Sequence, residues 1–103
     1  MDFADKTVLV TGGTRGIGRA IASDFASRGA RVAVLFRSDR GSADEALLAL
    51  GSGHIAIQAD VADPAQVESA VDDVIAQFGR LDIVVNNAGI GIYHPLPTTN
   101  YAD

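Results

Sequence analysis

The stretch Lys6-Thr7-Val8-Leu9-Val10-Thr11-Gly12-Gly13-Thr14-Arg15-Gly16-Ile17-Gly18 decides the fold of this chain. It is a short apolar run that leads into a glycine-patterned turn and then into a helical sequence. A dinucleotide pyrophosphate needs this arrangement, because glycine permits the tight turn and lets the backbone approach the phosphates. The helix that follows directs its free N–H groups and the positive end of its dipole at the anion. The stretch therefore predicts a strand, a phosphate-binding turn and a helix.

The glycine spacing is Gly12-x-x-x-Gly16-x-Gly18 rather than the commoner G-x-G-x-x-G. A glycine pattern alone is weak evidence, since an ordinary glycine-rich turn has the same composition. The strand before it and the helix after it supply the context that the nucleotide interpretation requires. A P-loop is disfavoured, because no Gly-Lys-Ser or Gly-Lys-Thr follows the first glycine.

The composition bounds the class of protein. A chain of 103 residues with 48% hydrophobic residues suits one packed domain. It has no cysteine, which excludes disulfides and thiolate metal sites and fits the cytoplasmic location that we predict. We also predict no metal site. A net charge of −5 argues against nucleic acid as a partner. No apolar run approaches the roughly 20 residues of a membrane span, and the first five residues do not resemble a signal peptide.

Two kinds of apolar segment alternate along the chain. Near-continuous apolar runs predict buried parallel strands, and apolar residues at i, i+3 and i+4 predict helices. The predicted strands are 8–11, 32–36, 55–59 and 83–86, and the predicted helices are 17–28, 42–50 and 64–78. In the first helix, Ile17, Ile21 and Phe25 are expected to face the core. The third helix has the clearest start, with Asp63 as N-cap and Pro64 in the first turn.

This order predicts a parallel sheet with helices on both faces, because crossovers between parallel strands are right-handed. The fold class is α/β, a doubly wound Rossmann sheet of strand order 3-2-1-4, truncated after the fourth strand. Residues 1–103 are then the N-terminal part of one NAD(P)-binding domain. The stretch 91–103, with its prolines, is predicted to be irregular loop. That would leave the fourth strand, around 81–85, as an exposed apolar edge that invites self-association.

Arg37 lies just past the second predicted strand. An NAD-binding fold usually places Asp or Glu about 20 residues after the glycines, where it binds the ribose 2′-hydroxyl. Here Phe36 or Arg37 takes that place, and arginine would instead bind a 2′-phosphate through charge-assisted hydrogen bonds. Arg15, within the glycine turn, could reach the same phosphate. These cations favour NADP(H) over NAD(H), unless both are merely solvated surface charges.

Two further groups follow predicted strands, at the carboxyl ends where open α/β sheets bind ligands. Asp60 and Val61 come after the third strand, and Asn87-Ala88-Gly89 comes after the fourth. Asp60 could accept a hydrogen bond from the adenine amino group while Val61 packs on the ring. The alternative is that Asp60 is an ordinary residue of an end-of-strand turn.

These segments resemble the N-terminal half of a short-chain dehydrogenase/reductase. The resemblance rests on residues 11–18, on Ala59-Asp60-Val61 and on Asn86-Asn87-Ala88-Gly89, in that order and spacing, and it covers residues 3 to 103. Within the family the chain is most similar to the 3-oxoacyl-acyl-carrier-protein reductase-like group. Thr11 and Asn86 are implied to form a structural tie between the central strands.

The resemblance also implies a cofactor role for each matching residue. Those implied to hold the pyrophosphate and the adjoining ribose are Gly12, Thr14, Arg15, Gly16, Ile17 and Gly18. Those implied to hold the 2′-phosphate are Arg15 and Arg37, with Ser38 close by. Asp60 and Val61 would contact adenine, and Asn87, Ala88 and Gly89 would line the cofactor beside the adenosine ribose.

The family's chemistry is hydride transfer between the cofactor and a carbonyl or alcohol, with a Tyr, a Lys four residues later, and a Ser. This chain offers no such pair, since Lys6 is its only lysine and Pro97 stands four residues after Tyr93. We therefore predict no catalytic residue in this chain and an active, oligomeric enzyme only for the intact protein, with a small-molecule substrate. The alternatives are a non-catalytic NADP(H)-binding module and one half of a split enzyme.

Overall fold

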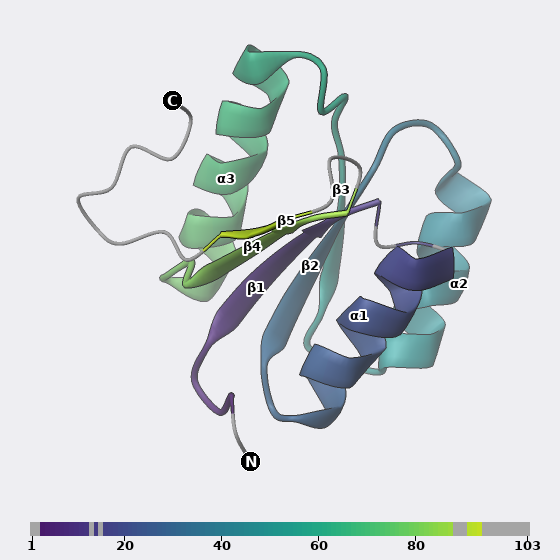
Figure 1. The fold of residues 1–103 in the computed structure, drawn as a ribbon, viewed down its shortest axis with the longest axis vertical. Coiled ribbons are helices and arrows are strands. Elements are labelled where there is room, and N and C mark those ends of the chain that lie inside the picture. Colours follow the sequence, from purple (N-terminus) through teal and green to yellow (C-terminus); the bar gives the residue numbers. More distant parts are fainter. Residues whose placement is uncertain (1–2, 13, 15, 88–90, 94–103) are drawn as a thin grey trace.

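Strands and helices alternate along the chain, as the sequence predicts (Figure 1). The structure is a computed structural model that describes residues 3–12, 14, 16–87 and 91–93. The elements are β1 (Thr7–Thr11), α1 (Gly16–Ser27), β2 (Arg31–Phe36), α2 (Arg40–Leu50), β3 (Ile55–Gln58), α3 (Pro64–Phe78), β4 (Ile83–Asn86) and β5 (Gly91–Tyr93). In this part of the chain no helix is long and apolar enough to cross a membrane.

The sheet has the order β3-β2-β1-β4-β5, and its first four strands are parallel. β1 lies in the centre, with Val8 opposite Val32 of β2 on one side and Ile83 of β4 on the other. Figure 1 shows α1 and α2 on one face of the sheet and α3 on the other. The predicted doubly wound Rossmann order, 3-2-1-4, is confirmed.

The prediction of irregular loop from residue 91 onward is wrong for Gly91–Tyr93. These residues form β5, which pairs antiparallel with β4 and sets Tyr93 opposite Val84. The predicted exposed edge at β4 is wrong for the same reason, because β4 has a strand on each side. A three-residue strand is too short to show a period, whereas the backbone groups of β4 need partners regardless of sequence. Residues 94–103 lie outside the described residues.

The core has one layer on each face of the sheet. Alternate residues of β1 and β2, such as Val10 and Val34, pack with Ala22 of α1. Their neighbours, such as Leu9 and Leu35, pack with Val74 of α3. Both faces of these strands are thus buried, which explains their continuous apolar runs.

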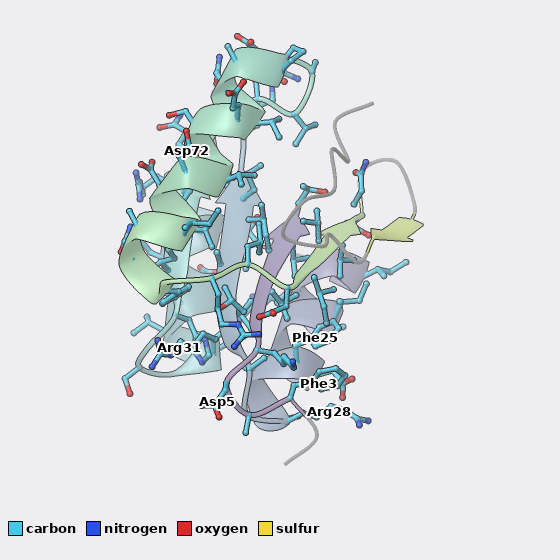
Figure 2. The ribbon with its side chains drawn as sticks, turned by 90° about the vertical axis from the view of Figure 1, so that its left-hand side faces the viewer. Phe3, Asp5, Phe25, Arg28, Arg31 and Asp72 are labelled. Atoms are coloured by element: carbon cyan, nitrogen blue, oxygen red, sulfur yellow. The ribbon has the colours of Figure 1, made fainter. Side chains whose placement is uncertain are left out.

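The first turn of α1 departs from the predicted apolar stripe. Ile21 and Phe25 pack on the core as expected. The rings of Phe25 and Phe3 meet edge to face, with 5.0 Å between their centres (Figure 2). Ile17, however, is 74% exposed. Ile17 therefore lies off the packed face of the helix, although Gly18 in the same turn is buried, and the start of α1 stands at the carboxyl edge of the sheet.

The helix starts are set by aspartate caps. Asp63 accepts a hydrogen bond from Ala65 N at 3.0 Å, and Pro64 occupies the first turn of α3, as predicted. α2 begins at Arg40 instead of residue 42, because Asp39 is its N-cap and accepts from Ser42 N at 3.0 Å. Asp39 also accepts from Ser42 Oγ at 2.7 Å.

The amino edge of the sheet is tied by two side chains. The Asp82 carboxylate accepts from Thr7 N at 2.8 Å and from Arg80 Nη2 at 2.7 Å. His54 Nδ1 accepts from Val32 N at 3.0 Å and so joins the start of β3 to β2. Both ties join segments that are distant in sequence.

Candidate cofactor-binding site

The carboxyl ends of β1 to β4 bring the predicted site residues to one edge of the sheet. Gly12 follows β1, Arg37 follows β2, Asp60 follows β3 and Asn87 follows β4. This edge is where parallel α/β sheets bind ligands. Arg15, Ala88 and Gly89 lie outside the described residues, so their predicted contacts remain predictions.

The glycine turn forms a cradle that side chains would fill. Gly12 and Gly16 have φ of 64° and 61°, the left-handed region that glycine adopts without strain. A Cβ on Gly18 would lie 2.1 Å from the carbonyl oxygen of Gly12. Gly12 N in turn donates to Leu35 O at 2.9 Å, which fixes the turn to the end of β2. The turn can hold this shape only with glycine at these positions.

The end of β4 closes on the same turn. Asn87 Nδ2 lies 3.5 Å from Gly12 O, a long hydrogen bond between residues 75 positions apart. Behind it, Thr11 Oγ1 donates to Asn86 Oδ1 at 3.2 Å. Thr11 and Asn86 thus tie the central strands together, as expected. Thr14, also predicted for this site, is buried beside the turn.

Arg37 and Asp60 face each other across the ends of β2 and β3. Arg37 Nε lies 3.9 Å from Asp60 Oδ2, and the Arg37 side chain is 81% exposed. The other oxygen of Asp60 accepts from Ala62 N at 2.9 Å, so Asp60 also shapes the turn that carries Val61. Asp60 is thus a residue of the turn after β3, and its other oxygen, Oδ2, is the one near Arg37. Val61 is partly exposed there.

One more arginine at this edge, Arg40, was not predicted from the sequence. The Arg40 guanidinium carbon lies 4.7 Å from the centre of the Phe36 ring, within the range of a cation–π contact. Phe36 is only 4% exposed and therefore gives Arg40 a fixed support. The signal available in the sequence was the close spacing of two arginines around the predicted start of a helix.

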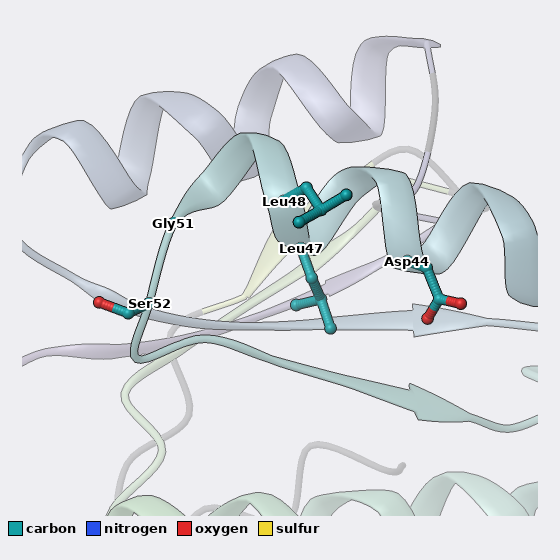
Figure 3. Close-up of a pocket in the computed structure, with 5 residues that line it drawn as sticks. All are labelled: Asp44, Leu47, Leu48, Gly51 and Ser52. Atoms are coloured by element: carbon teal, nitrogen blue, oxygen red, sulfur yellow. The ribbon is translucent and has the colours of Figure 1, made fainter.

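A hollow beside α2 does not belong to this site. It is lined by Asp44, Leu47, Leu48, Gly51 and Ser52 (Figure 3). These residues lie along α2 and just beyond its C-terminal end, away from the carboxyl edge of the strands. They offer aliphatic surface and one carboxylate, but no cradle for a phosphate. Figure 3 shows Leu47 and Leu48 on successive positions of the helix.

The sheet order, the helices on both faces and the glycine turn define a doubly wound α/β domain of the Rossmann type. The chain belongs to the short chain dehydrogenase family, whose family model matches residues 6–103. Hydroxynaphthalene reductase of Aspergillus fumigatus is 43% identical to it over 106 aligned positions, and 3-oxoacyl-acyl-carrier-protein reductase FabG of Escherichia coli is 47% identical over 90.

Solved structures agree with this assignment. A short chain dehydrogenase from Burkholderia cenocepacia in complex with NADP matches 100% of this chain with a TM-score of 0.82 and 44% identity. A blue fluorescent protein from a metagenomic library in complex with NADPH matches 100% with a TM-score of 0.80 and 42% identity. The chain covers 43% and 44% of those two chains, and 39% and 36% of the two reductases.

Proposed function

We propose that this chain is the cofactor-binding part of an NADP(H)-dependent oxidoreductase that acts on a carbonyl or alcohol. The observation that carries the proposal is the glycine cradle, in which Gly18 packs against the Gly12 carbonyl at the start of α1. Such a turn admits a pyrophosphate to the backbone N–H groups at a helix N-terminus. The NADP and NADPH complexes among the similar structures support the same cofactor.

The described residues fit the parts of this cofactor. Gly12, Gly16 and Gly18 put no side chain of their own into the cradle where the pyrophosphate would lie, and Asn87 stands beside it for the adjoining ribose. Asp60 and Val61 would hold the adenine, and Arg37 with Ser38 would hold the 2′-phosphate. Phe36 or Arg37 takes the place where an acidic residue would bind the 2′-hydroxyl of NAD(H), and this lack of an acid beside a cation supports a preference for NADP(H).

When bound, the nicotinamide ring supplies or accepts a hydride. The residues of this chain bind and orient the dinucleotide, and we assign none of them to proton transfer. Lys6 directly precedes β1 and therefore stands at the amino edge of the sheet, whereas the cradle follows the carboxyl end of β1. A non-catalytic cofactor module and one half of a split enzyme would use this same site. A small-molecule substrate, oligomerisation and a cytoplasmic location remain predictions for the intact protein.

Cofactor titration tests the proposal. NADPH should bind more tightly than NADH, and Arg37→Gln should weaken NADPH binding about tenfold with little effect on NADH, since it removes a charge-assisted contact. Arg28→Gln is the matched control, because Arg28 lies just past the far end of α1. Failure of both cofactors to bind, or equal losses for both with Arg37→Gln, would overturn the proposal.

A further inference from the structure

We propose that Arg40, held on the ring of Phe36, is a further cation for the 2′-phosphate of the cofactor, in addition to Arg15 and Arg37. Phe36 is then its positioning residue. This inference rests on the proposed function and adds a specificity-determining residue to the site.

The first step is the position of Arg40. β2 ends at Phe36 and α2 begins at Arg40, so both residues stand at the carboxyl edge of the sheet, beside Arg37 and Ser38. The start of α2 adds the positive end of a helix dipole to the same place. An anion at this edge would therefore meet the Arg40 cation beside a helix N-terminus that Asp39 caps.

The second step is the support under Arg40. Its guanidinium carbon is 4.7 Å from the centre of a ring that is 4% exposed. An arginine side chain has many rotamers, and ordering it costs free energy on binding. A ring fixed in the core reduces that cost, because the guanidinium already stacks on it before the ligand arrives.

The third step is the contrast with Arg37. Arg37 leans toward β3, where Asp60 Oδ2 lies 3.9 Å from its Nε and offsets part of its charge. Its carbonyl oxygen accepts from Gln58 Nε2 at 3.1 Å, which also ties it to β3. Arg40 stands on the α2 side of the same strand end. The two arginines thus have different neighbours, since Arg37 lies beside Asp60 and Arg40 lies over the Phe36 ring.

The fourth step is the nearby carboxylate on the α2 side. Asp39 precedes Arg40, but its two oxygens accept from Ser42 N and Ser42 Oγ at 3.0 and 2.7 Å. That carboxylate is thus turned onto its own helix. A phosphomonoester, with its oxygens in several directions, can accept from two cations at once. The 2′-phosphate of NADP(H) is the part of the cofactor with this chemistry.

The test measures four ligands on the same protein: NADPH, NADH, 2′,5′-ADP and AMP. We expect Arg40→Gln to weaken 2′,5′-ADP and NADPH about tenfold and to leave AMP and NADH within twofold. Phe36→Leu keeps an apolar side chain in the core but removes the ring, and it should weaken the same two ligands selectively. Arg40→Lys keeps the charge and should recover part of the loss.

The chain offers a matched control at the opposite edge. Arg31 also stacks on a phenylalanine, with its guanidinium carbon 5.8 Å from the centre of the Phe78 ring, but it begins β2 at the amino edge. Arg31→Gln should change none of the four affinities. Thermal unfolding of each variant shows whether a change in affinity comes from a change in fold.

Two outcomes separate this inference from the proposed function. If the unaltered protein prefers 2′,5′-ADP to AMP and a folded Arg40→Gln variant keeps that preference in full, the role of Arg40 is overturned and the proposed function stands. If the unaltered protein binds none of the four ligands, both are overturned. Equal losses for AMP and 2′,5′-ADP with Arg40→Gln would also overturn the inference, because they would indicate a structural role.

Discussion

A Cβ on Gly18 would lie 2.1 Å from the carbonyl oxygen of Gly12, so the two residues pack together only because position 18 has no side chain. Real Cβ atoms essentially never come this close to backbone atoms. The contact couples the first turn of α1 to the turn after β1, and Asn87 from β4 reaches the same carbonyl. Any side chain at Gly18 must displace the Gly12 backbone as well as the Asn87 side chain.

Gly18→Ala should therefore destabilise the protein by about 1–3 kcal/mol, the typical cost of overpacking, and should abolish tight cofactor binding. The gain in helix propensity from glycine to alanine, about 1 kcal/mol, is too small to offset it. Gly41→Ala is the matched control, because its Cβ would meet Asp39 Oδ1 at an ordinary 3.5 Å. Urea unfolding and NADPH titration measure both effects. Equal behaviour of the two variants would contradict the steric argument.

Asp60→Asn should raise the preference for 2′,5′-ADP over AMP about threefold. The amide oxygen can still accept from Ala62 N, so the turn is kept, while the charge that offsets Arg37 is removed. The effect is small because Arg37 is mostly exposed and solvent screens the pair. AMP itself should bind more weakly, since adenine loses a carboxylate acceptor. Competition titrations with the two ligands check this, and an unchanged or lower preference would count against it.

Asp82→Asn should destabilise the protein by about 1–2 kcal/mol, because it removes the charge from the hydrogen bonds with Arg80 and Thr7 N. Burial raises the pKa of Asp82, but these hydrogen bonds and the positive charges of Arg80 and Lys6 outweigh it and leave the pKa below its ordinary 3.8. This contribution is thus present above pH 3.8 and is lost as the pH falls through the lowered pKa.

The matched control for Asp82 is Asp72→Asn, on the exposed side of α3 (Figure 2). Urea unfolding is measured between about pH 2 and 7. The loss of unfolding free energy in Asp82→Asn, relative to the unaltered protein, should become smaller toward the acid end of this range. Asp72→Asn should stay within about 0.5 kcal/mol of the unaltered protein at neutral pH. A loss for Asp82→Asn that does not depend on pH would refute the electrostatic part of the argument.

His54 should make stability fall as the pH drops below 6.5. Burial lowers the pKa of His54 from its ordinary 6.5, and its Nδ1 can accept from Val32 N only while unprotonated. The unfolded chain therefore binds the proton first, and stability declines from pH 6.5 down to the lowered pKa, below which this contribution is gone.

His54→Asn keeps an acceptor for Val32 N and has no titrating group. Its unfolding free energy should be flatter between about pH 5 and 7 than that of the unaltered protein. His54→Ala should be flat as well, but less stable by about 1 kcal/mol, because it leaves the Val32 N–H without its side-chain acceptor. A slope that persists in His54→Asn would assign the pH dependence to other groups.

Most of the fold could be predicted because its signals are local. The apolar runs of β1 and β2 are continuous because both faces are buried, and the Asp63-Pro64 cap marks the start of α3. β5 could not be predicted, since its pairing depends on the free edge of β4 and not on its own pattern. The prediction that Ile17 faces the core was wrong. The spacing of apolar residues in a helix does not show where the sheet beneath it ends.

The glycine turn of the candidate site could be predicted from the sequence, because its positive φ angles and close backbone contact favour glycine. The pairing of Arg37 with Asp60 and the stacking of Arg40 on Phe36 were not, because both depend on how the ends of different elements meet. Sequence spacing puts residues on the same edge, but it does not say which side of a strand end a long side chain takes.

The central place of β1 has a consequence for the order of folding. β1 can pair with β2 once Arg31–Phe36 has been synthesised, but its other side waits for β4, where Thr11 meets Asn86 across 75 positions. Closing so long a loop is slow compared with forming α1 or α2. The glycine turn would therefore stand on a partly formed sheet until β4 pairs with β1 and brings Asn87 to it. Among the described elements, the pairing of β4 with β1 would be the step that completes the candidate site.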